Sequence, residues 1–442
     1  MSKYKIELGI FIVSFAVFYL SWLFFFKVGI NSLPLQSEDA IPSIFTGISI
    51  VKEGSLHLDS YYSMMISKYP QPDDNTRTPF YLRKVGDHYL SAFPIMNTLL
   101  SIPVFLIYLP FVKEIAWSDV YILSHLSGSF ILVLCCVGIF YLFNKVLNSS
   151  IKNSLILVLI YALATINLPL ISQALWQHGA VQFFLILSII FFLKERLFLT
   201  YLFLGFAILS RPTAAIILLI LSIFLILYKK VNLKNIIYSG LGILIPLLFF
   251  LTYNFIYYQD ISNQGYSSQL GNSWLGNFPE SFFGIWLSPS KGLLVYSPIF
   301  IFSLIGIWKG FKQNQLIKIS FWVILIHTLV LSKWKHWYGG FGYGYRMISD
   351  VIPFFIFPLW YLIENFREKV IKGIILTTFV SIVIQFSGLI FFDSIWHNAY
   401  DRGFKDTSWL WSFRDSEAAF NYRRVLVKAG LLDKACEKCL PD

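Results

Sequence analysis

The chain has 442 residues, of which 57% are hydrophobic, 19% aromatic and only 13% charged, and its mean hydropathy is +0.66. A water-soluble protein of this length does not need so much apolar surface, so the composition excludes that class and predicts an all-α polytopic membrane protein. The formal net charge of +11 does not indicate a nucleic acid partner, because the basic residues stand mostly in short loops between apolar runs.

The first apolar run, residues 6–26, follows the basic start Met1-Ser-Lys-Tyr-Lys and is long enough to cross a bilayer. No small-residue cleavage site follows it, which predicts a signal anchor and not a removed signal peptide. Further spans are expected at 119–143, 154–170, 179–193, 197–209, 213–228, 236–257, 292–308, 318–332, 348–363 and 373–392.

Residues 31–92 form the first long polar interruption, and two adjacent carboxylates, Glu38 and Asp39, lie near its start. A carboxylate at the edge of a membrane can meet a lipid-borne substrate from one side and a polar substrate from the other. The residues that follow have helical spacing, which predicts a helix with one apolar face against lipid. The apolar positions of that face are Ile44, Phe45, Ile48 and Val51.

The apolar segment 94–112 is broken by Pro94, Pro103 and Pro110, so we interpret it as an interfacial or re-entrant helix of the same loop. The positive-inside rule then places the N-terminus in the cytoplasm and gives eleven spans. It also places outside the first loop 31–118, a second loop 258–291 and a C-terminal tail 393–442. A twelve-span arrangement with one more crossing stays open.

The predicted outer face collects aromatic, glycine, cationic and acidic residues. Aromatic rings and glycines suit a sugar face, Lys and Arg suit a phosphate, and a carboxylate suits a general base for a hydroxyl. The residues concerned include Glu38, Asp39, His57, Asp59, Tyr81, Arg83, Asp87, His88, Trp176, Gln177, His178, Arg211, Trp274, Trp286, Lys291, His336, Trp337, Tyr338, Tyr345, Arg346, Trp409, Trp411, Arg414 and Asp415.

Each of these signals also has a plain structural explanation. Glu38 and Asp39 also fit solvated residues that follow a helix end. His178 also fits an interfacial histidine bonded to backbone. The tryptophans are also typical of an aromatic belt, and Lys291 of an anchor that extends to the interface. The glycines from Gly339 to Gly344 also fit a flexible turn. Asp73 and Asp74 are interpreted as turn residues.

The four cysteines give little chemistry. Cys135 and Cys136 lie in an apolar run and are expected to pack there. Cys436 and Cys439 form one CxxC, which predicts a disulfide or two idle thiols in preference to a metal site. No metal ligand set or other cofactor is predicted, although dependence on a divalent metal is left open. The chain contains no GxSxG, no GxxxxGK[ST] and no HExxH.

Several short motifs resemble the GT-C superfamily of integral-membrane glycosyltransferases, most closely bacterial members related to protein mannosyltransferases and to the aminoarabinose transferases of lipid A. The resemblance is one of order and pattern over nearly the whole chain. The motifs are Glu38-Asp39, Leu175-Trp176-Gln177-His178, Ser210-Arg211-Pro212, Ser288-Pro289-Ser290-Lys291-Gly292-Leu293, Trp337-Tyr338-Gly339-Gly340 with Tyr345-Arg346, and Ser408 to Asp415.

The resemblance implies a GT-C fold over residues 1–442, with interfacial helices in the first external loop. It implies a polyprenyl-phosphate sugar donor, inversion at the anomeric carbon, and a site on the outer face of the bacterial inner membrane. The catalytic acid of the family's first loop falls on Asp39, with Glu38 as the neighbour that can take the role. The residues implied around the donor phosphate are Arg211, Lys291, Arg346 and His178, and those implied at sugar or lipid are Trp176, Trp337, Tyr338 and Tyr345.

The predicted activity is therefore transfer of a hexose or related sugar to a hydroxyl of a cell-surface glycan, lipid or protein. Two alternatives stay open. A transporter or flippase for a lipid-linked saccharide would need ionisable groups within the spans, where His125 and His327 are among the few candidates. An oligosaccharide ligase or oligosaccharyltransferase would keep the fold and change the donor. The sugar, the acceptor and the oligomeric state are left unassigned.

Overall fold

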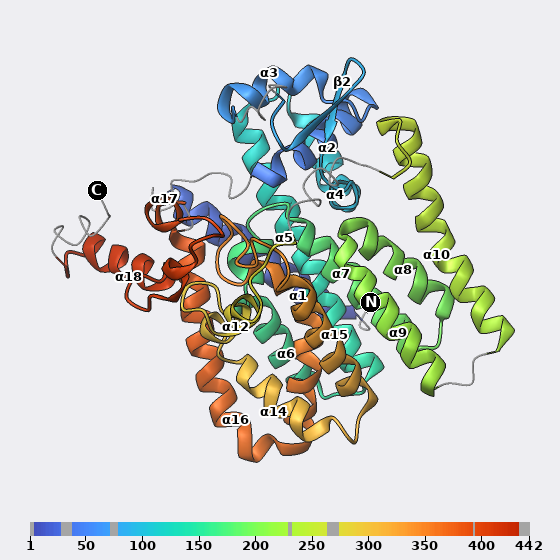
Figure 1. The fold of residues 1–442 in the computed structure, drawn as a ribbon, viewed down its shortest axis with the longest axis vertical. Helices are drawn as coiled ribbons and strands as arrows, with labels where there is room; N and C mark the ends of the chain where they lie inside the picture. Colours follow the sequence, from blue (N-terminus) through green and yellow to red (C-terminus); the bar gives the residue numbers. More distant parts are fainter. Residues whose placement is uncertain are drawn as a thin grey trace. The chain divides into compact units, whose positions relative to one another are not determined.

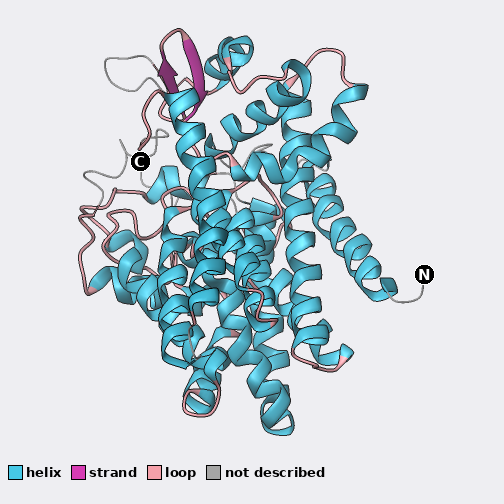
Figure 2. Ribbon diagram, turned by 90° about the vertical axis from the view of Figure 1, so that its right-hand side faces the viewer, coloured by secondary structure: helices cyan, strands magenta, loops and turns pink. Residues whose placement is uncertain are grey.

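A computed structural model describes residues 4–27, 38–70, 78–228, 232–262, 274–391 and 394–432. Nearly all of its regular structure is helical, and its only described sheet is one two-stranded hairpin (Figures 1 and 2), which confirms the helical class. Several residues singled out in the sequence lie outside the described ranges: Asp73, Asp74, Cys436 and Cys439.

The chain divides into two compact units, each described here by itself. Unit 1 comprises residues 1–19, 37–148 and 171–271, and unit 2 comprises residues 20–36, 149–170 and 272–442. The first helix, α1 (Lys5–Lys27), contributes to both.

Unit 1 contains most of the first half of the chain, including the described part of loop 31–118. Its elements in order are α2 (Ile41–Glu53) with the short turn η2 (Glu38–Ala40) before it, α3 (Asp59–Lys68), β1 (Leu82–Val85), β2 (His88–Ser91), α4 (Met96–Tyr108), η3 (Leu109–Phe111), α5 (Trp117–Tyr141), η4 (Leu142–Val146), α7 (Gln177–Leu193), α8 (Leu197–Ser210), η6 (Pro212–Ala214), α9 (Ala215–Tyr228), α10 (Leu233–Tyr253) and η7 (Asn254–Tyr258). Helices α7, α8 and α10 pack side by side (Figure 1).

The predicted helix after Asp39 forms, but the prediction for its apolar face was wrong. Ile44, Phe45 and Ile48 are fully buried, because α2 packs against α4 and Thr98 of α4 donates a hydrogen bond to the carbonyl oxygen of Ser43 (2.8 Å). Protein therefore covers this face instead of lipid. Segment 94–112 forms the short helix α4, with Pro103 inside it.

Unit 2 holds the second half of the chain and the C-terminal segment. Its elements are α6 (Ile151–Leu163), α12 (Glu280–Leu287), α13 (Leu293–Tyr296), α14 (Phe300–Gly310), α15 (Gln315–Leu331), η8 (Arg346–Val351), α16 (Ile352–Phe391), α17 (Ile395–Tyr400), η9 (Ser408–Trp411) and α18 (Glu417–Lys428), while η5 (Asn167–Ile171) runs from this unit into unit 1. The segment predicted as a polar tail thus folds into helices over its described part.

Three predicted spans have different limits in the structure. The helix of segment 154–170 ends at Leu163, and segment 292–308 is broken after Tyr296, where Pro298 follows within two residues. Segments 348–363 and 373–392 are joined in α16, which has a non-helical residue at Phe366 (φ −136°, ψ 19°).

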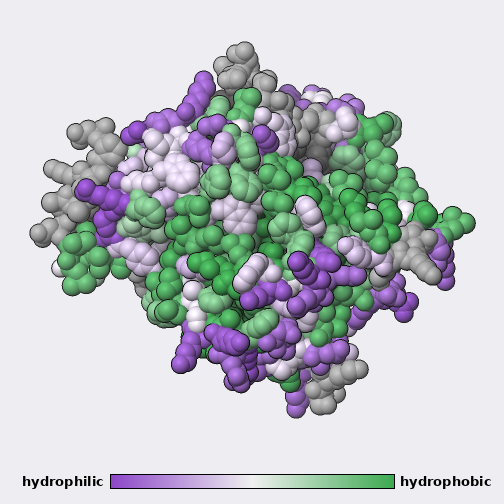
Figure 3. Space-filling view, turned by 60° about the horizontal axis from the view of Figure 1, so that its bottom comes forward, coloured by the Kyte–Doolittle hydropathy of each residue, from purple (hydrophilic) through white to green (hydrophobic). Residues whose placement is uncertain are grey.

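Four helical segments among the described residues are long and apolar enough to cross a membrane: Lys5–Lys27, Trp117–Val146, Leu233–Tyr258 and Arg346–Phe391. The outer surface of α10 is apolar, with Leu241, Leu244 and Leu248 all exposed. Figure 3 shows broad hydrophobic areas on one face of the molecule, with hydrophilic side chains gathered along its lower part. Exposed apolar surface of this extent is typical of a membrane protein.

Candidate functional site

The acidic pair lies in η2, directly before α2. Pro42 stands in the first turn of α2, where its missing N–H costs nothing, and the chain enters the helix without a side-chain cap. Glu38 and Asp39 are both partly buried. Negative charge is favoured at a helix start, so this position stabilises the pair of carboxylates to a degree.

The charge of Glu38 is nevertheless disfavoured. Burial raises the pKa of this carboxyl above its ordinary value, and the neighbouring Asp39 raises it further. Burial, Tyr121 and the charge of Glu38 together raise the pKa of Tyr69 to about 12. The same carboxylate contributes to a raised pKa of Tyr81, whose hydroxyl donates to the carbonyl oxygen of Tyr69 (2.9 Å). The acidic pair therefore lies in a tyrosine-rich, partly dehydrated part of unit 1.

Arg211 and His178 form a second polar group in unit 1. Arg211 occupies the extended residue that separates α8 from η6, and His178 lies in the first turn of α7. Nη1 of Arg211 is 2.6 Å from Nδ1 and 3.0 Å from Nε2 of His178, and both side chains are buried. A guanidinium keeps its charge when buried, so the imidazole accepts its hydrogen bond in the neutral form.

The first turn of α4 connects these two groups. Asn97 donates to the carbonyl oxygen of Leu175 (2.8 Å), three residues before His178, and Thr98 donates to Ser43, four residues after Asp39. All four residues of these two hydrogen bonds are buried. Two adjacent residues of one helix thus hold the first turn of α2, which follows the acidic pair, and the turn that leads to His178. The structure brings these two predicted groups to neighbouring parts of the same unit.

The Leu175–His178 turn is also held from α5. Ser129 donates to the carbonyl oxygen of Ser172 (3.1 Å). A Cβ at Gly128 would lie 2.6 Å from the carbonyl oxygen of Ile171 and 2.7 Å from that of Ala174, so only glycine lets the helix approach this closely. Trp176 is buried, and its ring centre is 6.2 Å from that of His178.

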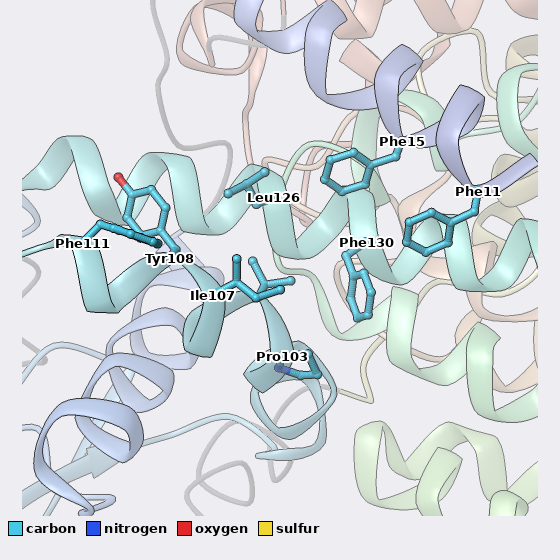
Figure 4. A pocket seen from close by; sticks show the side chains of 9 residues that line it. Phe11, Phe15, Pro103, Ile107, Tyr108, Phe111, Leu126 and Phe130 are labelled. Atoms are coloured by element: carbon cyan, nitrogen blue, oxygen red, sulfur yellow. The ribbon is translucent and has the colours of Figure 1, made fainter. Parts of the chain in front are cut away.

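Unit 1 also contains an apolar cavity of about 450 Å³ between α1, α4 and α5 (Figure 4). Phe11 and Phe15 of α1 and Phe130 of α5 face Ile107 and Pro103 of α4. The remaining lining residues are Val104, Tyr108, Phe111 and Leu126. A cavity lined in this way suits a hydrocarbon chain.

The other predicted site residues lie in unit 2, where Lys291 is almost fully buried. Its ammonium donates to Oε2 of Glu417 (2.9 Å), Nε2 of His397 (3.0 Å) and the carbonyl oxygen of Gly342 (2.5 Å). We call Lys291, His397 and Glu417 the tail cluster. A lysine ammonium has three N–H donors, and all three are used here. Lys291 would reach a phosphate only by releasing one of these partners, so its predicted phosphate role stays a prediction.

Electrostatics within the tail cluster follow from burial. Burial lowers the pKa of Lys291, and the carboxylate of Glu417 opposes this effect. Burial also lowers the pKa of His397, and the charge of Lys291 lowers it further, which leaves the imidazole neutral and able to accept from the ammonium. The ring of Trp396 lies 5.0 Å from the ammonium nitrogen.

The glycine-rich turn that was interpreted as a site or a flexible loop is tied to the tail cluster. The carbonyl oxygen of Gly342 accepts from Lys291, and the N–H of Gly344 donates to Glu417 (3.3 Å). The side chain of Arg346 folds back over the turn: a Cβ at Gly342 would lie 2.6 Å from Cδ of Arg346. A larger residue at this position would push the side chain of Arg346 aside.

The aromatic residues predicted to contact sugar or lipid are packed inside the protein. Trp337 packs on α12, Tyr338 makes an edge contact with Trp409 (5.3 Å), and the hydroxyl of Tyr345 bonds Ser297 (2.7 Å) and the N–H of Ile166 (2.9 Å). Trp176, Trp337, Tyr338 and Tyr345 are all at most 5% exposed. As substrate contacts they stay predictions.

Sequence reasoning missed His397 and Glu417. Both stand in the segment that was interpreted as an external tail, and neither lies in a recognisable motif. The only local signal is Ser416 before Glu417: a serine followed by a carboxylate marks a helix start, and Ser416 does cap α18 by accepting from Ala419.

Comparison with known proteins adds no assignment. No protein-family model matches the chain, and no curated protein matches its sequence.

Proposed function

We propose that the protein is a GT-C-type glycosyltransferase that moves a sugar from a polyprenyl-phosphate donor to an acceptor hydroxyl. The observation that carries this proposal is in unit 1. The first turn of α4 bonds the backbone just after the two carboxylates, through Thr98 and Ser43, and the turn just before His178 of the buried arginine–histidine pair, through Asn97 and Leu175. A base for a hydroxyl and a cation for a phosphate are the two groups that such a transfer needs.

In the proposed reaction Asp39 takes the proton of the acceptor hydroxyl, whose oxygen attacks the anomeric carbon. The bond from that carbon to the carrier phosphate breaks, and its electron pair leaves with the polyprenyl phosphate. Arg211, held by His178, stabilises the negative charge of this leaving group. Attack opposite the leaving phosphate inverts the anomeric centre. Glu38 is the alternative base, since burial raises its pKa.

The apolar cavity between α1, α4 and α5 supports a lipid-borne donor, and we assign it to part of the polyprenyl chain. The proposal includes the eleven-span topology, with the first loop on the external face of a bacterial inner membrane. The acceptor is a glycan, lipid or protein at the cell surface. Lys291 and Arg346 remain further candidates for the donor phosphate.

The test uses purified full-length protein in lipid, radiolabelled polyprenyl-phosphate glucose, mannose or galactose, and a membrane extract as the acceptor source. We expect label to move to a new product with the wild type. We expect Asp39→Asn to lower turnover roughly a hundredfold or more, because the acceptor loses its base.

Asp87→Asn is the matched control, since Asp87 is an exposed carboxylate in the same loop, and its turnover should equal that of the wild type. Full turnover of Asp39→Asn contradicts Asp39 as the base, and loss in Glu38→Gln would then assign that role to Glu38. Lipid translocation in vesicles without covalent transfer contradicts the whole proposal.

A further inference from the structure

Two histidines and an aspartate of the first external loop meet at one place in unit 1. His57 lies in the connection between α2 and α3, Asp59 is the first residue of α3, and His88 begins β2. One ligand atom from each lies within 4.8 Å of the others. We call these three residues the loop cluster. Neither the acidic pair nor the Arg211–His178 pair is part of it.

We propose that the loop cluster binds one divalent transition-metal ion, of which zinc fits best. Two imidazoles and one carboxylate are a common ligand set for zinc, with water completing the coordination. Around a tetrahedral zinc the ligand atoms lie about 3.4 Å apart. Asp59 and His88 are exposed, so small side-chain rotations bring the three atoms to that separation.

The backbone that carries the ligands is fixed on both sides. The N–H of Leu58 donates to the carbonyl oxygen of Tyr89 (2.8 Å), which joins the α2–α3 connection to β2. The N–H of His57 donates to Ser55 (3.0 Å), and the carbonyl oxygen of His57 accepts from Ser49 (2.8 Å). The ligand positions are therefore arranged before any ion binds.

The side chains also show partners of the kind that surround metal ligands. Oδ1 of Asp59 accepts from the N–H of Tyr89 (2.8 Å), while Oδ2 lies 2.8 Å from Nδ1 of His88. The rings of His57 and His88 stack 3.9 Å apart, and Tyr257 contacts the ring of His57 edge-on. The two imidazoles and the carboxylate thus lie close enough together to share one cation.

Beneath the loop cluster lies a small apolar core that keeps the two segments together. Its buried members include Leu90, Tyr253 and Tyr258, and Leu56 and Val85 pack against it from the two ligand-bearing segments. The hairpin turn at Gly86 (φ +57°) sets His88 opposite Val85. A bound ion would add a second tie between the α2–α3 connection and the hairpin, at their exposed side.

The test is zinc binding by the full chain in detergent, with purification tags removed and prior dialysis against a chelator. Cys436→Ser and Cys439→Ser are introduced in every protein, because that CxxC is a rival zinc ligand. We expect about one zinc per chain after desalting. We expect His88→Ala and Asp59→Asn each to weaken binding at least tenfold. Cobalt should give visible absorption that the two variants lose.

Asp87→Asn is again the matched control, because Asp87 precedes His88 but is outside the loop cluster, and it should bind zinc like the wild type. Far-ultraviolet circular dichroism and size-exclusion chromatography check that each variant keeps its fold. The inference is overturned if the parent protein retains no zinc. It is equally overturned if His88→Ala and Asp59→Asn retain one zinc at unchanged affinity, because the ion then lies elsewhere.

Discussion

Glu38 and Glu417 are the same residue type, and each begins a helical segment, but their surroundings are opposite. Glu417 is almost fully buried and bonds the ammonium of Lys291 at 2.9 Å. Glu38 is partly buried beside the like charge of Asp39, and its pKa is raised. The charge of Glu417 is matched by its neighbours in unit 2, whereas the charge of Glu38 is disfavoured by its neighbours in unit 1.

This difference separates a structural carboxylate from a candidate functional one. A buried ion pair with all its hydrogen bonds made holds segments together, here Lys291, the Gly342 turn and the start of α18. A carboxylate that is kept where its charge costs free energy is not explained by stability. Proteins keep such groups where activity needs them. The predictions that follow test this contrast.

The largest effect is expected from Glu417→Leu. The substitution leaves the Lys291 ammonium buried without its carboxylate partner, and an uncompensated buried charge costs about 3–5 kcal/mol of unfolding free energy. A large fall in the thermal unfolding midpoint of the detergent-solubilised protein would show this. Arg402 supplies the control, since its ion pair with Asp406 is exposed: Arg402→Leu should leave the midpoint nearly unchanged. An unchanged midpoint in Glu417→Leu removes the structural half of the contrast.

A smaller effect is expected when both partners of the pair are replaced. Lys291→Met combined with Glu417→Leu removes the charge as well as its partner, so at least half of the stability lost in Glu417→Leu should return. Recovery is incomplete because Gly342 and His397 lose a hydrogen-bond donor. A double variant no more stable than Glu417→Leu would show that the charge is not the cause.

The same double variant tests the phosphate role predicted for Lys291. If Lys291 is structural, the double variant keeps glycosyl transfer once it is stable. If Lys291 holds the donor phosphate, transfer is lost although the fold is kept. Arg346→Gln serves as the comparison, because Arg346 is the other predicted phosphate residue of unit 2.

The sequence predicted the helical class because apolar runs of span length leave few other folds. It predicted less well whether lipid or another helix covers an apolar helix face. The face of Ile44, Phe45 and Ile48 has the same pattern whether lipid or α4 covers it, and only the tertiary contact at Thr98 distinguishes the two. Pro298 indicated the helix break after Tyr296, but the apolar run is long enough to be taken for one continuous span.

The contacts of the candidate site could not be predicted from the sequence for the same reason. Arg211 and His178 were both named from the sequence, yet their contact joins residues 33 positions apart. The loop cluster and the tail cluster also depend on distant pairs: 29 positions separate Asp59 from His88, and 126 separate Lys291 from Glu417. Residue types can be read in order along a chain, but pairs brought together by folding cannot be read from spacing alone.

The smallest effect has the opposite sign and is expected from Glu38→Gln. The folded-state pKa of Glu38 lies above its ordinary value of 4.5, so the folded protein favours the protonated carboxyl. That contribution to stability is fully present below pH 4.5 and is lost as the pH rises through the raised pKa. At pH 7 a neutral glutamine therefore stabilises the protein, by less than about 1 kcal/mol because solvent screens a partly exposed group. At pH 4 the gain should vanish, since Glu38 is then protonated in both states.

Thermal unfolding at the two pH values measures the difference, and Glu114→Gln, at an exposed glutamate of the same loop, should change neither midpoint. A destabilised Glu38→Gln at pH 7 would mean that the charge of Glu38 is matched in the folded protein, and the acidic pair would then be structural like Glu417.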